Sequence, residues 1–157
     1  MTELPDWVQR LDLAPHPEGG WFRETWRSDL TLAESVLPPD YNGSRSAGTA
    51  ILFVLMADQQ SAWHTVRSAE LWLHHRGSPL LLEFGREKDS ATTHVLGPDI
   101  TAGHHPQLLV PPGYWQRARP RDDEQGAAGV RDGLELGGVE PLEEVVTGHL
   151  GNPTRGP

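Results

Sequence analysis

The sequence predicts one all-β domain that begins with a short helix. Its 17 Gly and 14 Pro residues argue against a helical bundle, because both residue types interrupt helices. Short apolar stretches separated by turn residues recur roughly every 8–12 positions, a rhythm typical of a β-sandwich or β-barrel. A chain of 157 residues is long enough for one domain and short for two. We therefore expect residues 1–157 to form a single domain.

The first elements are expected before residue 47. Apolar spacing predicts a short helix over Pro5–Leu13, and the Pro- and Gly-rich segment 14–20 ends it. A strand is expected over Trp21–Ser28, followed by a surface loop over residues 29–46. Alternation along that strand puts Trp21, Arg23, Thr25 and Arg27 on one face and Phe22, Glu24 and Trp26 on the other.

The strand pattern is clearest in the middle of the chain. Thr49–Met56 is continuously apolar, which predicts a strand buried on both faces. Shorter strands are expected at Ser61–Val66, Glu70–His75, Leu80–Phe84, Thr92–Leu96, Gln107–Val110 and Tyr114–Arg117. The segment from Pro120 to Pro157 has no aromatic residue. It predicts either one or two weak strands or an acidic tail without regular structure.

Composition excludes several classes of protein. The net charge of 13 − 22 = −9 disfavours nucleic-acid binding, which needs clustered Lys and Arg. The absence of Cys excludes disulfide scaffolds, thiol catalysis and thiolate metal sites. No apolar run approaches the length of about 20 residues needed to span a bilayer, and no signal peptide begins the chain. We expect a cytoplasmic protein that binds neither nucleic acid nor membrane.

His64 and Glu70 are the first candidate functional pair. They flank a short turn between two expected strands, and such residues can converge on one face. Burying both is costly unless they bond each other, a metal or a substrate. The pair is therefore either a structural hydrogen bond or part of a site. Likewise, five tryptophans either line a stacking pocket or fill the core and a dimer interface: Trp21, Trp26, Trp63, Trp72 and Trp115.

The spacing of His64, Glu70 and Gly77, and the Pro-x-Gly turn at residues 111–113, resemble the two motifs of the cupin superfamily. In that superfamily three His and one Glu form the usual metal site. Val66 and Gln116 stand where two of those His are expected. The resemblance thus implies that the usual site cannot form in its usual way, since an amide is a poor substitute for imidazole.

Further stretches narrow the resemblance to one branch, the RmlC-like "cupin five" domain of unknown function. They span residues 11–119 and comprise Leu13–Thr25, Thr49–Ile51, Ser61–His64, Glu70–Trp72, Leu96–Asp99 and Pro106–Trp115. The resemblance implies a small jelly-roll barrel, commonly a dimer, without a settled activity. Some members carry epimerase-like descriptions by analogy to sugar-nucleotide epimerases of the same fold.

The first functional hypothesis is an isomerase or epimerase acting on a small polar or sugar-like metabolite inside the barrel. His64 would be the general base, held by Glu70 and buried against Trp63 and Trp72. Arg23 and Arg117 would hold an anionic group of the substrate. The other expected substrate-binding residues are Gln107, Trp115 and Gln116.

Two alternatives stay open. In the first, the same pocket binds a small molecule without chemistry. In the second, a divalent metal supports oxygenase or hydrolase chemistry, and its first expected ligand set is His16, His64 and Glu70. We expect no tightly bound metal, because the motif positions supply only two good ligands. We also expect a homodimer, because the strand at Trp21–Ser28 carries apolar residues on both faces.

Overall fold

The structure is a computed structural model that describes residues 6–121 and the backbone of residues 145–150. It is mostly β, with one short helix, α1 (Asp6–Arg10), and three 3-10 turns, η1 (Glu34–Val36), η2 (Lys88–Ser90) and η3 (Ile100–Ala102). The strands are β1 (Ala14–Pro15), β2 (Trp21–Arg27), β3 (Thr31–Leu32), β4 (Arg45–Ser46), β5 (Thr49–Leu55), β6 (His64–Thr65), β7 (Glu70–Arg76), β8 (Leu80–Gly85), β9 (Thr92–Leu96), β10 (Gln107–Val110), β11 (Trp115–Pro120) and β12 (Val145–Leu150).

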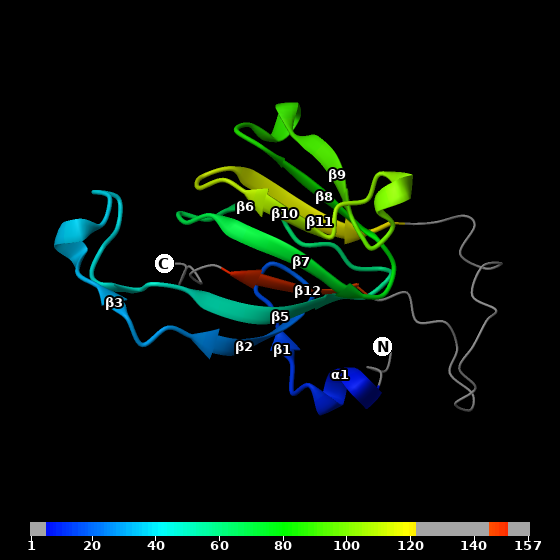
Figure 1. Ribbon diagram of the computed structural model, residues 1–157, viewed down its shortest axis with the longest axis horizontal. Helices are drawn as coiled ribbons and strands as arrows, with labels where there is room; N and C mark the ends of the chain where they lie inside the picture. Colours follow the sequence, from blue (N-terminus) through cyan, green and yellow to red (C-terminus); the bar gives the residue numbers. More distant parts are fainter. Residues whose placement is uncertain (1–5, 122–144, 151–157) are drawn as a thin grey trace.

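Two sheets form the body of the molecule (Figure 1). The larger has six strands in the order β1-β2-β5-β12-β7-β10, and the smaller has four in the order β6-β11-β8-β9. The pairing of the named strands is antiparallel. Strands far apart in sequence are neighbours, as β5 and β12 are, so the connections cross between sheets as in a jelly roll. The predicted all-β fold class is confirmed.

The main core lies between the two sheets. Because side chains alternate along β5, Ile51, Phe53 and Leu55 point inward. They pack against Leu80 and Leu82, which belong to β8 of the smaller sheet. Other buried members are Trp72, Leu96, Val110 and Ala118. Residues at alternate positions of β7 and β11 therefore point either into this core or away from it, and this decides which polar side chains meet inside.

A second, smaller core lies on the outer face of the larger sheet. Val8 of α1 packs with Val54 and Met56, and Trp21 and Leu13 lie against them. This explains why β5 is apolar at every position after Thr49: one face of β5 meets the main core and the other, in part, meets α1. Both predictions, the helix and the strand buried on two faces, are confirmed.

Several elements differ from the sequence-based expectation. The loop predicted over residues 29–46 contains the short β3–β4 pair and η1. The strand expected over Ser61–Val66 is reduced to β6, because Ser61 instead bonds the backbone of Ala118. A register shift between Glu24 and Trp26 pairs Trp26 with Ala50. This bulge places Trp26 on the same face as Trp21, not opposite it.

β12 (Val145–Leu150) belongs to the larger sheet. β12 pairs with both β5 and β7, so one of the weak strands expected after residue 120 is present at the sheet's centre. The rest of that expectation, whether a further strand or an irregular acidic tail, lies outside the described residues. Within the described ranges, no helix combines the length and apolar character needed to cross a bilayer.

Candidate functional site

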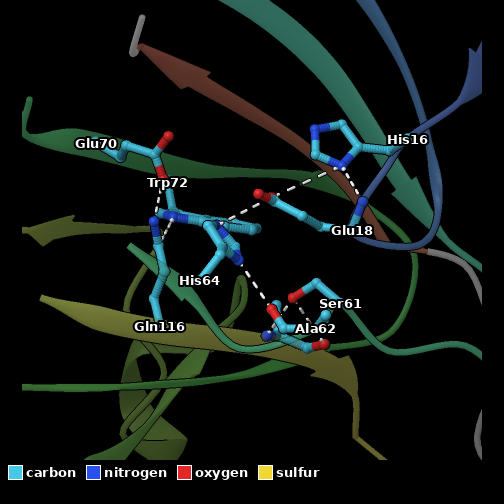
Figure 2. Close-up of polar contacts among 9 residues, drawn as sticks. His16, Glu18, Ser61, Ala62, His64, Glu70, Trp72 and Gln116 are labelled. Atoms are coloured by element: carbon cyan, nitrogen blue, oxygen red, sulfur yellow. Dashed lines mark hydrogen bonds and ion pairs between the residues drawn. The ribbon is translucent and has the colours of Figure 1, made fainter. Parts of the chain in front are cut away.

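His64 and Glu18 form a partly exposed pair at the start of β6 (Figure 2). Nε2 of His64 lies 3.4 Å from a carboxylate oxygen of Glu18, and the two side chains are 15% and 29% exposed. On the other side of the ring, Nδ1 lies 2.8 Å from the carbonyl oxygen of Ala62. Solvent can therefore reach a histidine whose two nitrogens both have a fixed neighbour.

The loop between β1 and β2 positions Glu18. The backbone carbonyl of Glu18 accepts a hydrogen bond from the Ala62 amide at 2.6 Å, so the loop is tied to the segment that carries His64. The next two residues are Gly19 and Gly20, both at positive φ. A Cβ atom on Gly19 would lie 2.6 Å from the carbonyl oxygen of Gln60, and one on Gly20 would lie 2.6 Å from that of Val54. Only glycine allows this close approach.

His16 completes the group from the other side of Glu18. Its Nδ1 accepts a hydrogen bond from the Glu18 amide at 3.2 Å and lies 3.8 Å from the Glu18 carboxylate. Its ring packs edge-on against Phe22 and Phe53, with centroids 4.8 and 5.4 Å away. Because Nδ1 accepts, a neutral His16 carries its proton on Nε2.

The donors and acceptors around His64 determine what the His64–Glu18 pair can do. A carbonyl oxygen only accepts, so Nδ1 of His64 carries a proton. If Nε2 lacked a proton, its lone pair would face a carboxylate lone pair, which is unfavourable. One proton placed on either Nε2 or the carboxylate makes the contact attractive. A protonated Nε2 would form an ion pair with Glu18, and an imidazole positioned beside a carboxylate is suited to general acid–base chemistry.

Glu70 is not the carboxylate that faces Nε2 of His64. It is 3% exposed, and it accepts a hydrogen bond from Nε2 of Gln116. Oε1 of Gln116 in turn accepts from Nε1 of Trp72 at 3.0 Å. Gln116 lies opposite His64 in the β6–β11 ladder, so this buried chain lies beside the His64 site. Glu70 was expected to orient His64. Instead, Glu18 faces His64 and Glu70 bonds Gln116.

Five expected substrate-binding residues point away from His64. Gln116 and Ala118 are buried, so Trp115 and Arg117 take the outer face of β11. Arg117 bonds Glu83 at 2.9 Å and stacks over Trp63, 4.8 Å from its ring centroid. Lys88 lies over Trp115.

The other two outward residues lie on the larger sheet. Arg23 pairs with Leu52, on the face of β2 opposite the core residue Phe22. Gln107 is exposed at the start of β10. Arg23, Gln107, Trp115 and Arg117 occupy the outward phase of their strands, and Trp63, just before β6, stacks with the outward Arg117, so the structure does not bring these five side chains together at His64. Of the expected set, Trp72 and Gln116 lie on the inner side.

The donor set does not fit the usual cupin metal site. Val66 is apolar and buried, and both ends of the Gln116 amide are engaged by Trp72 and Glu70. In the described part of the chain, no three His, Asp or Glu side chains are grouped so as to hold a metal ion. The alternative ligand set of His16, His64 and Glu70 is therefore not assembled here.

Glu18 is the site residue that sequence reasoning missed. Its signal was the pair of glycines that follows it, since Gly19 and Gly20 serve a close backbone approach rather than a simple break between elements. A carboxylate in such a loop has no strand phase, so alternation could not connect it with His64, 46 positions later.

Comparisons with known proteins agree with this fold. The family model described as "Cupin superfamily (DUF985)" matches residues 5–133. A hypothetical protein from Leishmania major has a structure similar to this one, with a TM-score of 0.71 and 25% identity over 93% of this chain and 78% of its own. The structure of a protein from Shewanella oneidensis is also similar, with a TM-score of 0.69 and 25% identity over 98% of this chain and 79% of its own. No curated protein matches. The chain belongs to the cupin superfamily, in its DUF985 family.

Proposed function

We propose that this cupin is an enzyme that moves protons on a small polar or sugar-like metabolite, as an isomerase or epimerase does. The observation that carries the proposal is the His64–Glu18 contact, in which Nδ1 is held by a carbonyl and Nε2 faces a carboxylate. Isomerisation needs a group that takes a proton and a group that returns one, and a positioned His–Glu pair supplies both. The fold alone carries no such argument, because one fold hosts many activities.

His64 and Glu18 have separate roles in this proposal. The proton held between Nε2 and the carboxylate is passed to the substrate from one of them, and the other takes a proton from the substrate. Ala62 keeps the ring oriented through Nδ1, and the loop glycines keep Glu18 in place. Glu70, Gln116 and Trp72 form a buried hydrogen-bonded chain beside the site. No step requires a metal.

A second candidate is a small-molecule binding protein without chemistry. It is favoured by the Glu70–Gln116–Trp72 chain, which fills two of the positions where the cupin motifs place metal ligands with side chains that bond one another. Both candidates use the same site, and both suit a cytoplasmic protein. Turnover separates them.

The test combines binding and exchange. A metabolite library is first screened by thermal shift, because a ligand at 100 times its Kd stabilises the folded state by about 2.7 kcal/mol. Each hit is then incubated with the protein in D2O, and deuterium entering a carbon position is followed by NMR. We expect exchange with the wild type and a loss of at least about 100-fold in His64→Gln and Glu18→Gln, the usual scale of acid–base catalysis.

Controls separate the three hypotheses. His75→Gln changes an exposed histidine of β7 and should leave exchange unchanged. A hit that binds without exchange, and loses binding in His64→Gln, identifies the binding protein. The metal hypothesis predicts that a chelator abolishes exchange and that one equivalent of zinc, nickel or iron restores it, whereas we expect the chelator to have no effect.

A further inference from the structure

The chain has two asparagines, and the residues that follow them differ in backbone chemistry. Asn42 precedes Gly43, and Asn152, which lies outside the described residues, precedes Pro153. The backbone nitrogen after an asparagine can attack the side-chain amide carbon if that nitrogen carries a hydrogen to lose. Glycine has such a nitrogen and no side chain to shield it, whereas proline has no backbone N–H. Asn42 is therefore the asparagine that can react in this way.

Asn42 lies on an arm formed by residues 28–48, which projects from the two sheets (Figure 1). The arm holds β3, η1 and β4, and none of its residues is buried. Asn42 and Gly43 lie between a hydrogen-bonded turn that ends at Tyr41 and the first residue of β4, Arg45. They belong to no helix or strand, so no ladder of backbone hydrogen bonds holds the two reacting residues in place.

The structure leaves both reacting groups unobstructed. The Asn42 side chain is exposed, and no side chain or backbone group in the described part of the chain bonds its amide. Across the same described ranges, the Gly43 N–H has no hydrogen-bond acceptor. A Cβ atom on Gly43 would have no atom within 4 Å. The nitrogen can therefore approach the amide carbon without breaking a hydrogen bond or displacing a neighbour.

We infer that Asn42 is a site of spontaneous deamidation, with water as the co-reactant. The Gly43 nitrogen loses its proton and bonds Cγ of Asn42, and the side-chain nitrogen leaves as ammonia. Water then opens the resulting five-membered succinimide at either of its carbonyls. The products are aspartate and isoaspartate at position 42, and no atom is oxidised or reduced. Each event adds one carboxylate, ionised at neutral pH, to a chain whose net charge is already −9.

This site is independent of the proposed isomerase. β2 is seven residues long, and it separates the arm from the loop that carries Glu18. The loop leads into Trp21 at the start of β2, and the arm follows Arg27 at its end. Deamidation therefore changes the charge and the backbone of the arm, at the end of β2 that is remote from His64.

The test follows the protein in water enriched with oxygen-18. Folded protein is incubated at mildly alkaline pH, where an amide nitrogen loses its proton more readily, and is then digested in ordinary water. Opening of the succinimide during the incubation places one oxygen-18 atom at position 42, and peptide mass mapping measures its rate of incorporation. We expect label at Asn42 and none at Asn152, which serves as the internal control.

Two variants and one change of solvent separate the reaction from its surroundings. Gly43→Ala places a methyl group beside the attacking nitrogen, and alanine resists the positive φ of this position. We expect it to slow labelling at least about tenfold, which corresponds to about 1.4 kcal/mol in activation free energy. Ser44→Ala keeps the Asn-Gly pair and should label within about twofold of the wild-type rate. The folded protein should label within about tenfold of the rate in denaturing urea, because the arm does not protect Asn42.

Three results would overturn the inference: equal labelling at Asn42 and Asn152, a Gly43→Ala rate equal to that of the wild type, or a folded rate more than about tenfold below the rate in urea. The labelling requires neither ligand nor turnover. A failure here leaves the proposed isomerase activity standing, and a protein that catalyses no deuterium exchange can still deamidate at Asn42, so the two failures are distinguishable.

Discussion

At the scale of single residues, Gln116 shows how an amide can replace a metal ligand and stabilise the interior. It is fully buried and bridges Trp72 and Glu70. Gln116→Leu removes both hydrogen bonds and leaves a buried carboxylate without that donor. We expect a loss of about 2–4 kcal/mol in unfolding free energy, measured by urea denaturation. Gln107→Leu, the same change at an exposed position of β10, should cost under about 0.5 kcal/mol; equal losses would contradict this account.

A second residue-scale prediction concerns acid stability. His94 stacks on Phe84 at 4.6 Å, and burial, with a smaller contribution from His105, lowers its pKa below the ordinary value of 6.5. The unfolded chain therefore takes up a proton first as the pH falls. The stabilising contribution of the neutral ring is complete above pH 6.5 and is lost as the pH falls toward the folded-state pKa.

NMR titration should give His94 a midpoint below 6.5. His94→Gln should make the fall in unfolding free energy between pH 7 and pH 5 shallower, but not abolish it, because burial also lowers the pKa of His74. The variant and the wild type should have parallel stability profiles above pH 7.5. A midpoint above 6.5 would show that burial does not govern this ring.

Some residues of the site could be predicted from the sequence, and others could not. His64 was predicted because a motif with fixed spacing carries it, and its inward phase follows from β-alternation. Arg23, Trp115 and Arg117 are the opposite case: their chemistry suited a substrate, but alternation alone does not say which face of a strand is buried. Their outward positions follow from the packing of the partly buried Phe22 against the core and from the burial of Gln116 and Ala118, which only the packed structure identifies.

At the scale of elements, the loop over residues 16–20 depends on glycine for two distinct reasons. Gly20 has φ +80, and its Cβ position lies 2.6 Å from the carbonyl oxygen of Val54. Gly43 has the same φ of +80 but no atom within 4 Å of its Cβ position. Comparing alanine at the two positions therefore separates the cost of backbone strain from the cost of a steric clash.

We expect Gly43→Ala to lower the unfolding free energy by about 1–2 kcal/mol, the cost of a left-handed conformation. Gly20→Ala should cost about 1–3 kcal/mol more, because the backbone of β5 must also shift. Urea denaturation measures both. The larger shift should also displace Glu18, so Gly20→Ala should lose ligand response and Gly43→Ala should keep it. Equal destabilisation would show that the close approach to Val54 is not a constraint.

Element boundaries were predictable where hydrophobic phase and turn residues agree, and less so elsewhere. β9 and β10 have the predicted bounds, Thr92–Leu96 and Gln107–Val110. β6 is short because Ser61 bonds Ala118 from outside the strand, a contact between distant segments. β12 is weakly coded in sequence, yet it pairs with β5 and β7. Its place in the sheet is set by pairing with the two strands that flank it, and local strand propensity does not describe such contacts.

At the scale of the whole molecule, the outer face of the larger sheet keeps apolar side chains in contact with water. α1 covers one end of that face through Val8, but Trp26 is 52% exposed and Leu109 is 57% exposed. β1 pairs with Trp21 and Phe22 of β2. In the described part of the chain, no other strand pairs with that edge of β2 beyond Phe22. Trp26 is thus an exposed apolar side chain on an open strand edge, and an open edge can pair with another chain.

We therefore keep the prediction of a homodimer and now assign it to the Arg23–Arg27 edge of β2. The sequence-based reason was apolar residues on both faces; the structural reason is that the bulge turns Trp26 outward beside an open edge. Light scattering at micromolar concentration should give about twice the chain mass of 17.3 kDa.

Trp26→Asp should give the monomer, because it places a charge at the centre of a symmetric contact. Ile100→Asp, a change at an apolar residue that is also exposed, on η3, should leave the dimer intact. A wild-type monomer, or a dimer that Trp26→Asp does not disturb, would show that this edge is not the interface.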